Sequence, residues 1–169
     1  MSAYAEVVQR LQSEERIARE DVRRWIDSGD LLTWSAVYAL DPTRITPELT
    51  AEEQLDFMRR YLLRCLVENP SPGDYLHGGF EAAWELAACL KQWHQRGGKG
   101  PAAVRGVAIE LEKLYRGGDP ALQNRILCGV LEHAFEEPAV RRYFSGWQRD
   151  IELREIYRLA LEWGEAHEP

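Results

Sequence analysis

Few residues of this chain favour β-strands. Its 169 residues include nine Val, seven Ile and four Thr, against twenty Leu and eighteen Ala. Small and unbranched side chains favour helices, whereas β-branched side chains favour strands. The composition therefore predicts an all-α protein. A chain of this length buries about 70% of its surface on folding, which supports a core without a metal or a disulfide.

The chain also lacks a long apolar run and a signal sequence. Its most apolar stretch, residues 82–90, is interrupted by Glu85 and is far shorter than the roughly 20 residues of a membrane-spanning helix. The first ten residues contain Glu6 and no basic segment followed by an apolar one, which a secretory signal requires. We therefore expect a cytoplasmic protein without a membrane partner.

Positive charge is scarce as well. The chain has 21 Lys and Arg against 28 Asp and Glu, a net charge of -7, which opposes binding to phosphate backbones and anionic lipid. Residues 1–85 hold nine basic and sixteen acidic residues, whereas residues 86–169 hold twelve of each. The excess negative charge lies in the first half, and we do not expect nucleic acid as a partner.

Cysteines are few, and their number is odd. Cys65, Cys89 and Cys128 all stand at helix-like positions. Free cysteine is commonly buried, so we expect reduced core cysteines. A reactive thiol or one incidental disulfide stays an alternative.

Sequence motifs of common enzyme chemistries are missing. There is no His-Glu-x-x-His, no phosphate-binding glycine loop and no dinucleotide fingerprint. His77-Gly78-Gly79 is similar to an esterase oxyanion segment, but no serine stands in a Gly-x-Ser-x-Gly elbow, so we expect only a helix start there. We expect no catalytic residue, no cofactor and no metal. A hydrolase that uses carboxylates in an inter-helical cleft stays an alternative.

The second half of the chain contains clear helix boundaries. Thr50 and Glu53 form a capping box, which predicts a helix that ends before Pro70. Further helices are expected over residues 76–95, 102–116, 120–135 and 138–144. The tripeptide Arg-Gly-Gly recurs about twenty residues apart and indicates successive antiparallel helices joined by short turns. Gly146 should end the short helix, and Asp150 should cap the last one.

The first half is less regular. Residues 3–25 predict one or two charged helices, residues 31–40 predict a short helix, and nothing over residues 43–49 is typical of a strand. We expect a single helical domain over residues 1–169, with charged helices up to residue 49 and regular antiparallel helices over residues 50–169. Seven to eight helices would form an irregular bundle or a short HEAT-like stack of helical hairpins.

Acidic and aromatic residues in the first half form a candidate partner-binding surface. Its members are Glu14, Glu15, Glu20, Asp21, Asp27, Asp30, Trp34 and Tyr38. Neighbouring arginines allow a second interpretation, a solvated helix face with local ion pairs. In the functional interpretation, the carboxylates match a basic protein. Trp34 and Tyr38, together with Trp147 in a loop, are the aromatics that we expect to reach the surface and to anchor a partner.

The last third of the chain carries a resemblance. The runs Leu131-Glu132-His133-Ala134-Phe135-Glu136-Glu137-Pro138 and Leu161-Glu162-Trp163-Gly164, with Arg142-Tyr143-Phe144 and Trp147 between them, resemble the tail of small acidic helical immunity proteins of bacterial polymorphic toxin systems. The resemblance implies a non-catalytic protein that binds a cognate toxin in the cytoplasm and blocks its active site or substrate path. It transfers no site residues. A helical-repeat scaffold without inhibitory function stays an alternative.

Overall fold

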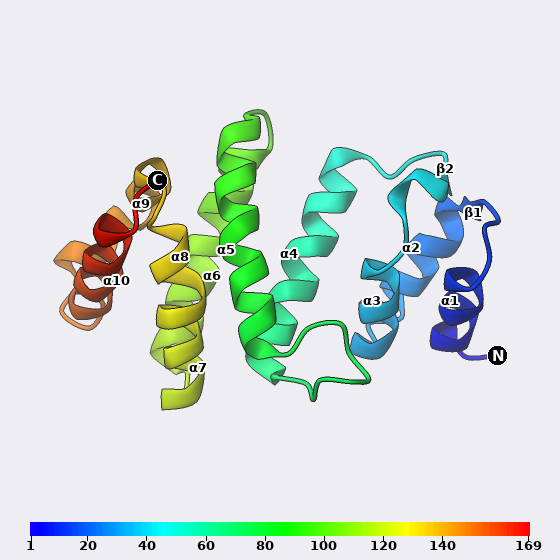
Figure 1. The fold of residues 1–169 in the computed structure, drawn as a ribbon, viewed down its shortest axis with the longest axis horizontal. Coiled ribbons are helices and arrows are strands. Elements are labelled where there is room, and N and C mark those ends of the chain that lie inside the picture. Colours follow the sequence, from blue (N-terminus) through cyan, green and yellow to red (C-terminus); the bar gives the residue numbers. More distant parts are fainter. The chain divides into compact units, whose positions relative to one another are not determined.

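Apolar residues at three- and four-residue spacing form the buried faces of helices throughout the computed structural model, which describes residues 1–169. The predicted all-α class is confirmed, since 73% of the chain is helical and the only strands form a two-stranded sheet. Residues 1–78 and residues 79–169 form two compact units (Figure 1). None of the helices has the length and apolar character needed to cross a membrane.

The N-terminal unit is built around a short buried helix. Its elements are α1 (Ala3–Leu11), β1 (Ile17–Ala18), α2 (Arg19–Asp27), α3 (Leu31–Tyr38), η1 (Pro42–Arg44), β2 (Ile45–Thr46) and α4 (Ala51–Glu68). Helix α3 is apolar on nearly all sides, and α1, α2 and α4 all pack against it. The side chains of Leu31, Trp34 and Val37 are therefore buried.

The prediction that residues 43–49 contain no strand is wrong. Ile45 pairs with Ile17, and Thr46 pairs with Ala18, in a parallel arrangement of two short strands. Both isoleucines are buried. The pairing joins residues far apart in sequence, and a two-residue strand is too short to show alternating hydrophobicity.

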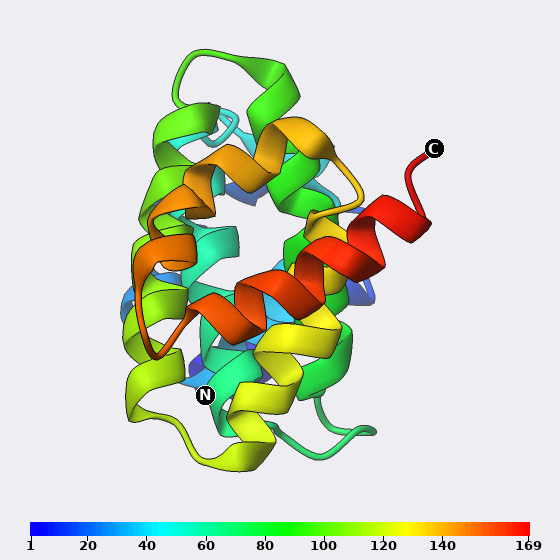
Figure 2. The same cartoon turned by 90° about the vertical axis from the view of Figure 1, so that its left-hand side faces the viewer.

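The C-terminal unit begins with two long helices, continues with several short helical segments and ends in a longer helix. Its elements are α5 (Gly79–Arg96), α6 (Gly100–Gly117), α7 (Pro120–Asn124), η2 (Arg125–Leu131), α8 (Glu132–Ala134), α9 (Pro138–Arg141), η3 (Arg142–Arg149) and α10 (Arg154–Ala166). Helix α5 contacts both α6 and the π-helical segment η2. Helix α10 runs obliquely across this unit and packs on η2, α8 and η3 (Figure 2).

Most predicted helix boundaries hold where a side chain caps the backbone. Thr50 and Glu53 form the capping box of α4, and Asp119 accepts the amide of Leu122 at the start of α7. Helix α4 lies in the N-terminal unit. The regular spacing of its apolar residues had led us to group it with the later helices. The single-domain organisation over residues 1–169 stays a prediction.

Two boundaries differ from the prediction. Gly146 does not end the short helix, because the chain continues as the 3₁₀-helix η3 to Arg149. The last helix begins at Arg154 rather than directly after Asp150. The Asp150 carboxylate accepts the amides of Glu152 and Leu153, so it caps a turn that precedes the helix.

Replacing Gly129 by alanine should destabilise the C-terminal unit. A Cβ at this position of η2 would lie 2.4 Å from the Cβ of Ala83 on α5, and neither atom can rotate away. We expect Gly129→Ala to lower the free energy of unfolding by about 1–3 kcal/mol, as overpacking of a core typically does. Urea unfolding followed by circular dichroism measures this loss. Gly146→Ala is the matched control, since nothing lies within 4 Å of the position that its methyl group would take; equal stability of the two variants would contradict the account.

Candidate functional site

The six acidic residues of the candidate surface lie around α2. Glu14 and Glu15 lie in the connection from α1 to β1, and Glu20, Asp21 and Asp27 lie on α2. Asp30 directly precedes α3 and is its N-cap. The structure therefore places all six on one contiguous stretch that ends where the buried helix begins.

Three of these six carboxylates have partners within the unit. Glu15 pairs with Arg10, and Asp21 pairs with Arg24 at 3.0 Å. The Asp30 carboxylate accepts the hydroxyl of Thr33 at 2.6 Å and its amide at 2.8 Å. These hydrogen bonds from Thr33 hold the pKa of Asp30 below its usual range. Asp30 therefore holds the start of α3.

The other three carboxylates have no hydrogen-bond or ion-pair partner. Glu14, Glu20 and Asp27 are all exposed. Glu20 and Asp27 are seven residues apart on α2, so they lie on the same helix face about 10 Å apart. We call Glu14, Glu20 and Asp27 the free acidic group.

Every arginine of the N-terminal unit is engaged within that unit. Residues 1–78 contain nine arginines, no lysine and fourteen Asp and Glu. The arginines donate to carboxylates, hydroxyls and backbone oxygens of the same unit; they are Arg10, Arg16, Arg19, Arg23, Arg24, Arg44, Arg59, Arg60 and Arg64. No arginine is therefore left over for the free acidic group.

The expectation that Trp34 lies at the surface is wrong. Its side chain is 3% exposed, and its indole nitrogen donates to the carbonyl of Ile26 at 2.7 Å. The guanidinium groups of Arg60 and Arg64 each lie 4.9 Å from the ring centroid. Trp34 is buried because helices pack on several sides of α3. Tyr38, at the end of α3, is half-buried.

Trp147 is also buried, at 3% exposed. The exposed tryptophans are Trp84 on α5, at 51%, and Trp163 on α10, at 38%. Trp84 directly follows Ala83, which is buried on the same helix. One residue corresponds to a rotation of 100° on a helix, which places Trp84 outside the buried stripe.

Trp84 and Trp163 belong to a strip of aromatic and imidazole rings on the C-terminal unit. His133 lines a hollow with Trp84, and its ring centroid lies 6.3 Å from that of Trp163. Trp163 in turn stacks on His167 at 4.1 Å. We call Trp84, His133, Trp163 and His167 the aromatic strip. Exposed tryptophans of this kind are typical of protein-binding surfaces.

A polar network joins three segments of the N-terminal unit. The Tyr61 hydroxyl lies 3.0 Å from Nδ1 of His77 and 3.4 Å from Oγ of Ser35. The Ser35 hydroxyl also accepts the amide of Leu76 at 2.6 Å. Burial raises the pKa of the Tyr61 hydroxyl above its usual range. The network holds the segment before Gly79 against α3 and α4, which explains why α5 begins later than predicted.

The three thiols are free and differ in burial. Cys65 and Cys89 are buried, as predicted, whereas Cys128 is half-buried. Burial raises the pKa of the Cys65 thiol to about 11 and that of Cys89 to about 12. No group of three or more His, Cys, Asp or Glu side chains is arranged to hold a metal ion.

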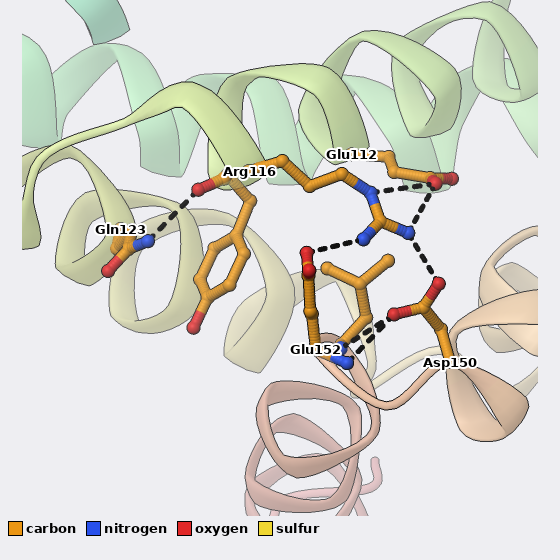
Figure 3. Close-up of polar contacts among 7 residues, drawn as sticks. Glu112, Arg116, Gln123, Asp150 and Glu152 are labelled. Atoms are coloured by element: carbon orange, nitrogen blue, oxygen red, sulfur yellow. Dashed lines mark hydrogen bonds and ion pairs between the residues drawn. The ribbon is translucent and has the colours of Figure 1, made fainter.

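Arg116 binds three carboxylates in the C-terminal unit (Figure 3). Its guanidinium donates to Glu112 one turn earlier on α6, and to Asp150 and Glu152 in the connection from η3 to α10. The hydrogen bond from Arg116, together with backbone amides, holds the pKa of Asp150 below its ordinary value of 3.8. This cluster ties α6 to the segment that leads into α10.

Comparisons with protein-family models, with curated proteins and with solved structures found no match to this chain.

Thiol labelling should distinguish Cys128 from the other two cysteines. At about pH 8 we expect a thiol reagent to modify only Cys128 in the native protein. Burial raises the pKa of all three thiols, but Cys65 and Cys89 are also closed to the reagent, whereas Cys128 is only half-buried. All three thiols should react in denaturant. The measurement is mass spectrometry of the labelled chain, with Cys128→Ser as the control that removes native labelling. Native labelling of Cys65 or Cys89 at the rate of Cys128 would contradict the burial.

Replacing Arg116 by glutamine should weaken the C-terminal unit near neutral pH. Since the pKa of folded Asp150 lies below its unfolded value, the stabilisation is present above about pH 4 and is lost as the pH falls through the folded pKa. We expect Arg116→Gln to lower the free energy of unfolding more at about pH 7 than at about pH 2. Urea unfolding at both pH values measures this.

The control for that series is Lys113→Gln on the same helix. Lys113 makes one ion pair, with Glu110 at 3.1 Å, and its side chain is 67% exposed. Its removal should have little effect at either pH, because exposed single pairs contribute little. A loss for Arg116→Gln that is equal at both pH values would show that Asp150 does not carry the stabilisation.

Proposed function

We propose that this chain is a non-catalytic binding protein whose N-terminal unit presents the free acidic group to a basic protein partner. The observation that carries the proposal is the imbalance within residues 1–78. All nine arginines donate to acceptors inside the unit, while Glu14, Glu20 and Asp27 are exposed and have no partner. Charge complementarity with a basic surface would satisfy these carboxylates.

Physical chemistry favours a role of these carboxylates in association. Exposed like charges create a field that steers an oppositely charged protein and raises the association rate. The field extends over about 8–10 Å at physiological salt, so Glu20 and Asp27 on one face of α2 act together. Because the nearby arginines are already bound to other acceptors, a partner need not displace them.

We further propose that the partner is a bacterial toxin domain and that the protein inhibits it by occlusion in the cytoplasm. The support is the resemblance of residues 131–164 to immunity proteins of polymorphic toxin systems, together with the net charge of -7. Inhibition by occlusion needs a stable complex and no catalytic group in this chain. It also predicts one-to-one binding to a basic toxin domain.

The proposal is tested by neutralising the free acidic group. The variant Glu14→Gln, Glu20→Gln, Asp27→Asn keeps the size of each side chain and removes three charges. The partner is captured from the native cell with the tagged wild-type chain, identified and purified. We expect the variant to associate about tenfold more slowly than the wild type at low salt, with a smaller salt dependence of the rate.

A matched variant controls for net charge alone. Glu81→Gln, Glu110→Gln, Glu165→Gln removes the same charge from the C-terminal unit. Its association rate should stay close to that of the wild type. If both triple variants associate at the same rate and with the same salt dependence, the free acidic group does not guide the partner and the proposal is wrong.

A further inference from the structure

An apolar pocket opens into the N-terminal unit between α3, α4 and the segment around β2. Its volume is about 180 Å³. The floor is formed by side chains that are at most 6% exposed, namely Val22, Val37, Leu40, Ile45 and Phe57. Half-buried residues of α4 and of the preceding loop, among them Leu49 and Met58, line the mouth. The pocket is therefore a recess in the core with an open side.

The size and lining of the pocket set what it can hold. An apolar cavity of about 150 Å³ accommodates a benzene ring. The pocket thus has room for one phenylalanine, leucine or methionine side chain. Water gains few hydrogen bonds there, because Gln54 and Tyr38 are the only polar side chains in the lining.

Carboxylates stand beside the mouth. Asp41 lies between the lining residues Leu40 and Pro42, and Glu48 directly precedes the lining residue Leu49. The Asp41 carboxylate accepts hydrogen bonds from Thr43. Glu48 is exposed, and its carboxylate has no partner.

The arginines in and beside residues 41–48 donate to neutral oxygens, and Arg16 donates to the hydroxyl of Thr46. Arg44 donates to the carbonyls of Arg10 and Glu15, and Arg19 donates to the carbonyl of Glu48. These contacts hold loops together and leave the Glu48 carboxylate unpaired. Residues 40–58, which contain most of the lining, include five Asp and Glu and one Arg. This surplus of negative charge suits an occupant that carries positive charge on either side of an apolar group.

We infer that the pocket binds one large apolar side chain of the protein partner, flanked in the partner by arginine or lysine. This inference rests on the proposed function and names the anchor of the complex. Burying one such side chain strengthens binding by about 10- to 100-fold. A gain of this size alone would give a free small molecule only weak affinity. Within a wider protein interface it is a large share, because a few buried apolar or aromatic side chains commonly supply most of the binding free energy.

Defined peptides test the inference without the natural partner. The first probe is an acetylated and amidated pentapeptide with phenylalanine at its centre and two arginines on each side. The matched probe has alanine at the centre, and a third has phenylalanine between glutamates. Dissociation constants come from nitrogen-15 NMR titrations of the full chain, with shift changes expected around the pocket, at Val37, Ile45 and Met58.

We expect the basic phenylalanine peptide to bind at least about tenfold more tightly than the alanine peptide, and also more tightly than the acidic phenylalanine peptide. Val37→Phe places a ring in the pocket and should abolish the preference for phenylalanine. Val37→Leu fills less of the pocket and should reduce the preference while keeping the fold. Ile109→Phe is the control, since Ile109 is 54% exposed on α6.

Three outcomes would overturn the inference. Equal affinities of the phenylalanine and alanine peptides would do so, as would a preference that survives in both folded Val37 variants. A third is a rise in melting temperature with toluene when no peptide shows a preference, because the pocket would then take a small apolar molecule instead of a side chain.

The natural partner separates this inference from the proposed function. Filling the pocket should speed dissociation of the partner about tenfold or more, whereas neutralising the free acidic group should slow its association. If the Val37 variants dissociate like the wild type while the acidic variant associates slowly, the pocket inference is wrong and the proposed function stands. If the acidic variant associates normally, the proposed function fails whatever the peptides show.

Discussion

The N-terminal unit depends on arginines that bind acceptors distant in sequence. Arg44 holds the end of α1 and the following loop through the carbonyls of Arg10 and Glu15, and Arg64 on α4 holds the carbonyl of Gly29 before α3. Arg23 on α2 binds Glu53 at the start of α4. These contacts join α2 to α4 and tie α1 and α4 to the loops between the helices, in addition to the packing of all three helices on α3. Because folding engages every arginine, the surplus carboxylates stay unpaired, and this division of charge is the basis of the proposed function.

The C-terminal unit is held together differently, by close approach of helix backbones. Gly129 on η2 lies against Ala83, and the position of a Cβ on Gly164 would be 2.4 Å from the carbonyl oxygen of Phe135. The small residue Gly129 lets η2 pack closely on α5, and Gly164 lets α10 pack closely on the backbone of Phe135. The Arg116 cluster fixes the connection into α10. The aromatic strip lies on this unit, so the chain carries a second surface of a different chemical character. The acidic surface and the apolar pocket belong to the N-terminal unit alone.

Local signals predicted much of this structure, and contacts between distant residues account for what was missed. The capping box of Thr50 and Glu53 acts within four residues, so sequence reveals it. One interpretation of the charge pattern of residues 14–30 was a set of local ion pairs. Asp21 does pair with Arg24, but Arg16 and Arg23 bind Thr46 and Glu53, each 30 residues away. The sequence therefore allowed us to name Glu14, Glu20 and Asp27 among the candidate residues. It did not show which of the candidate carboxylates are paired in the folded chain. Trp34 was misplaced because its burial depends on helices that pack from other parts of the chain, and no sequence pattern marks the pocket.

Hydrogen exchange of the full chain, with and without its bound partner, tests the central claim most directly. The claim is that the partner contacts the N-terminal unit at α2 and around the pocket. It predicts that binding slows amide exchange over residues 14–27 and 40–58, while exchange in the C-terminal unit changes little. Protection confined to residues 79–169, around Trp84 and Trp163, would contradict it and would make the aromatic strip the binding surface.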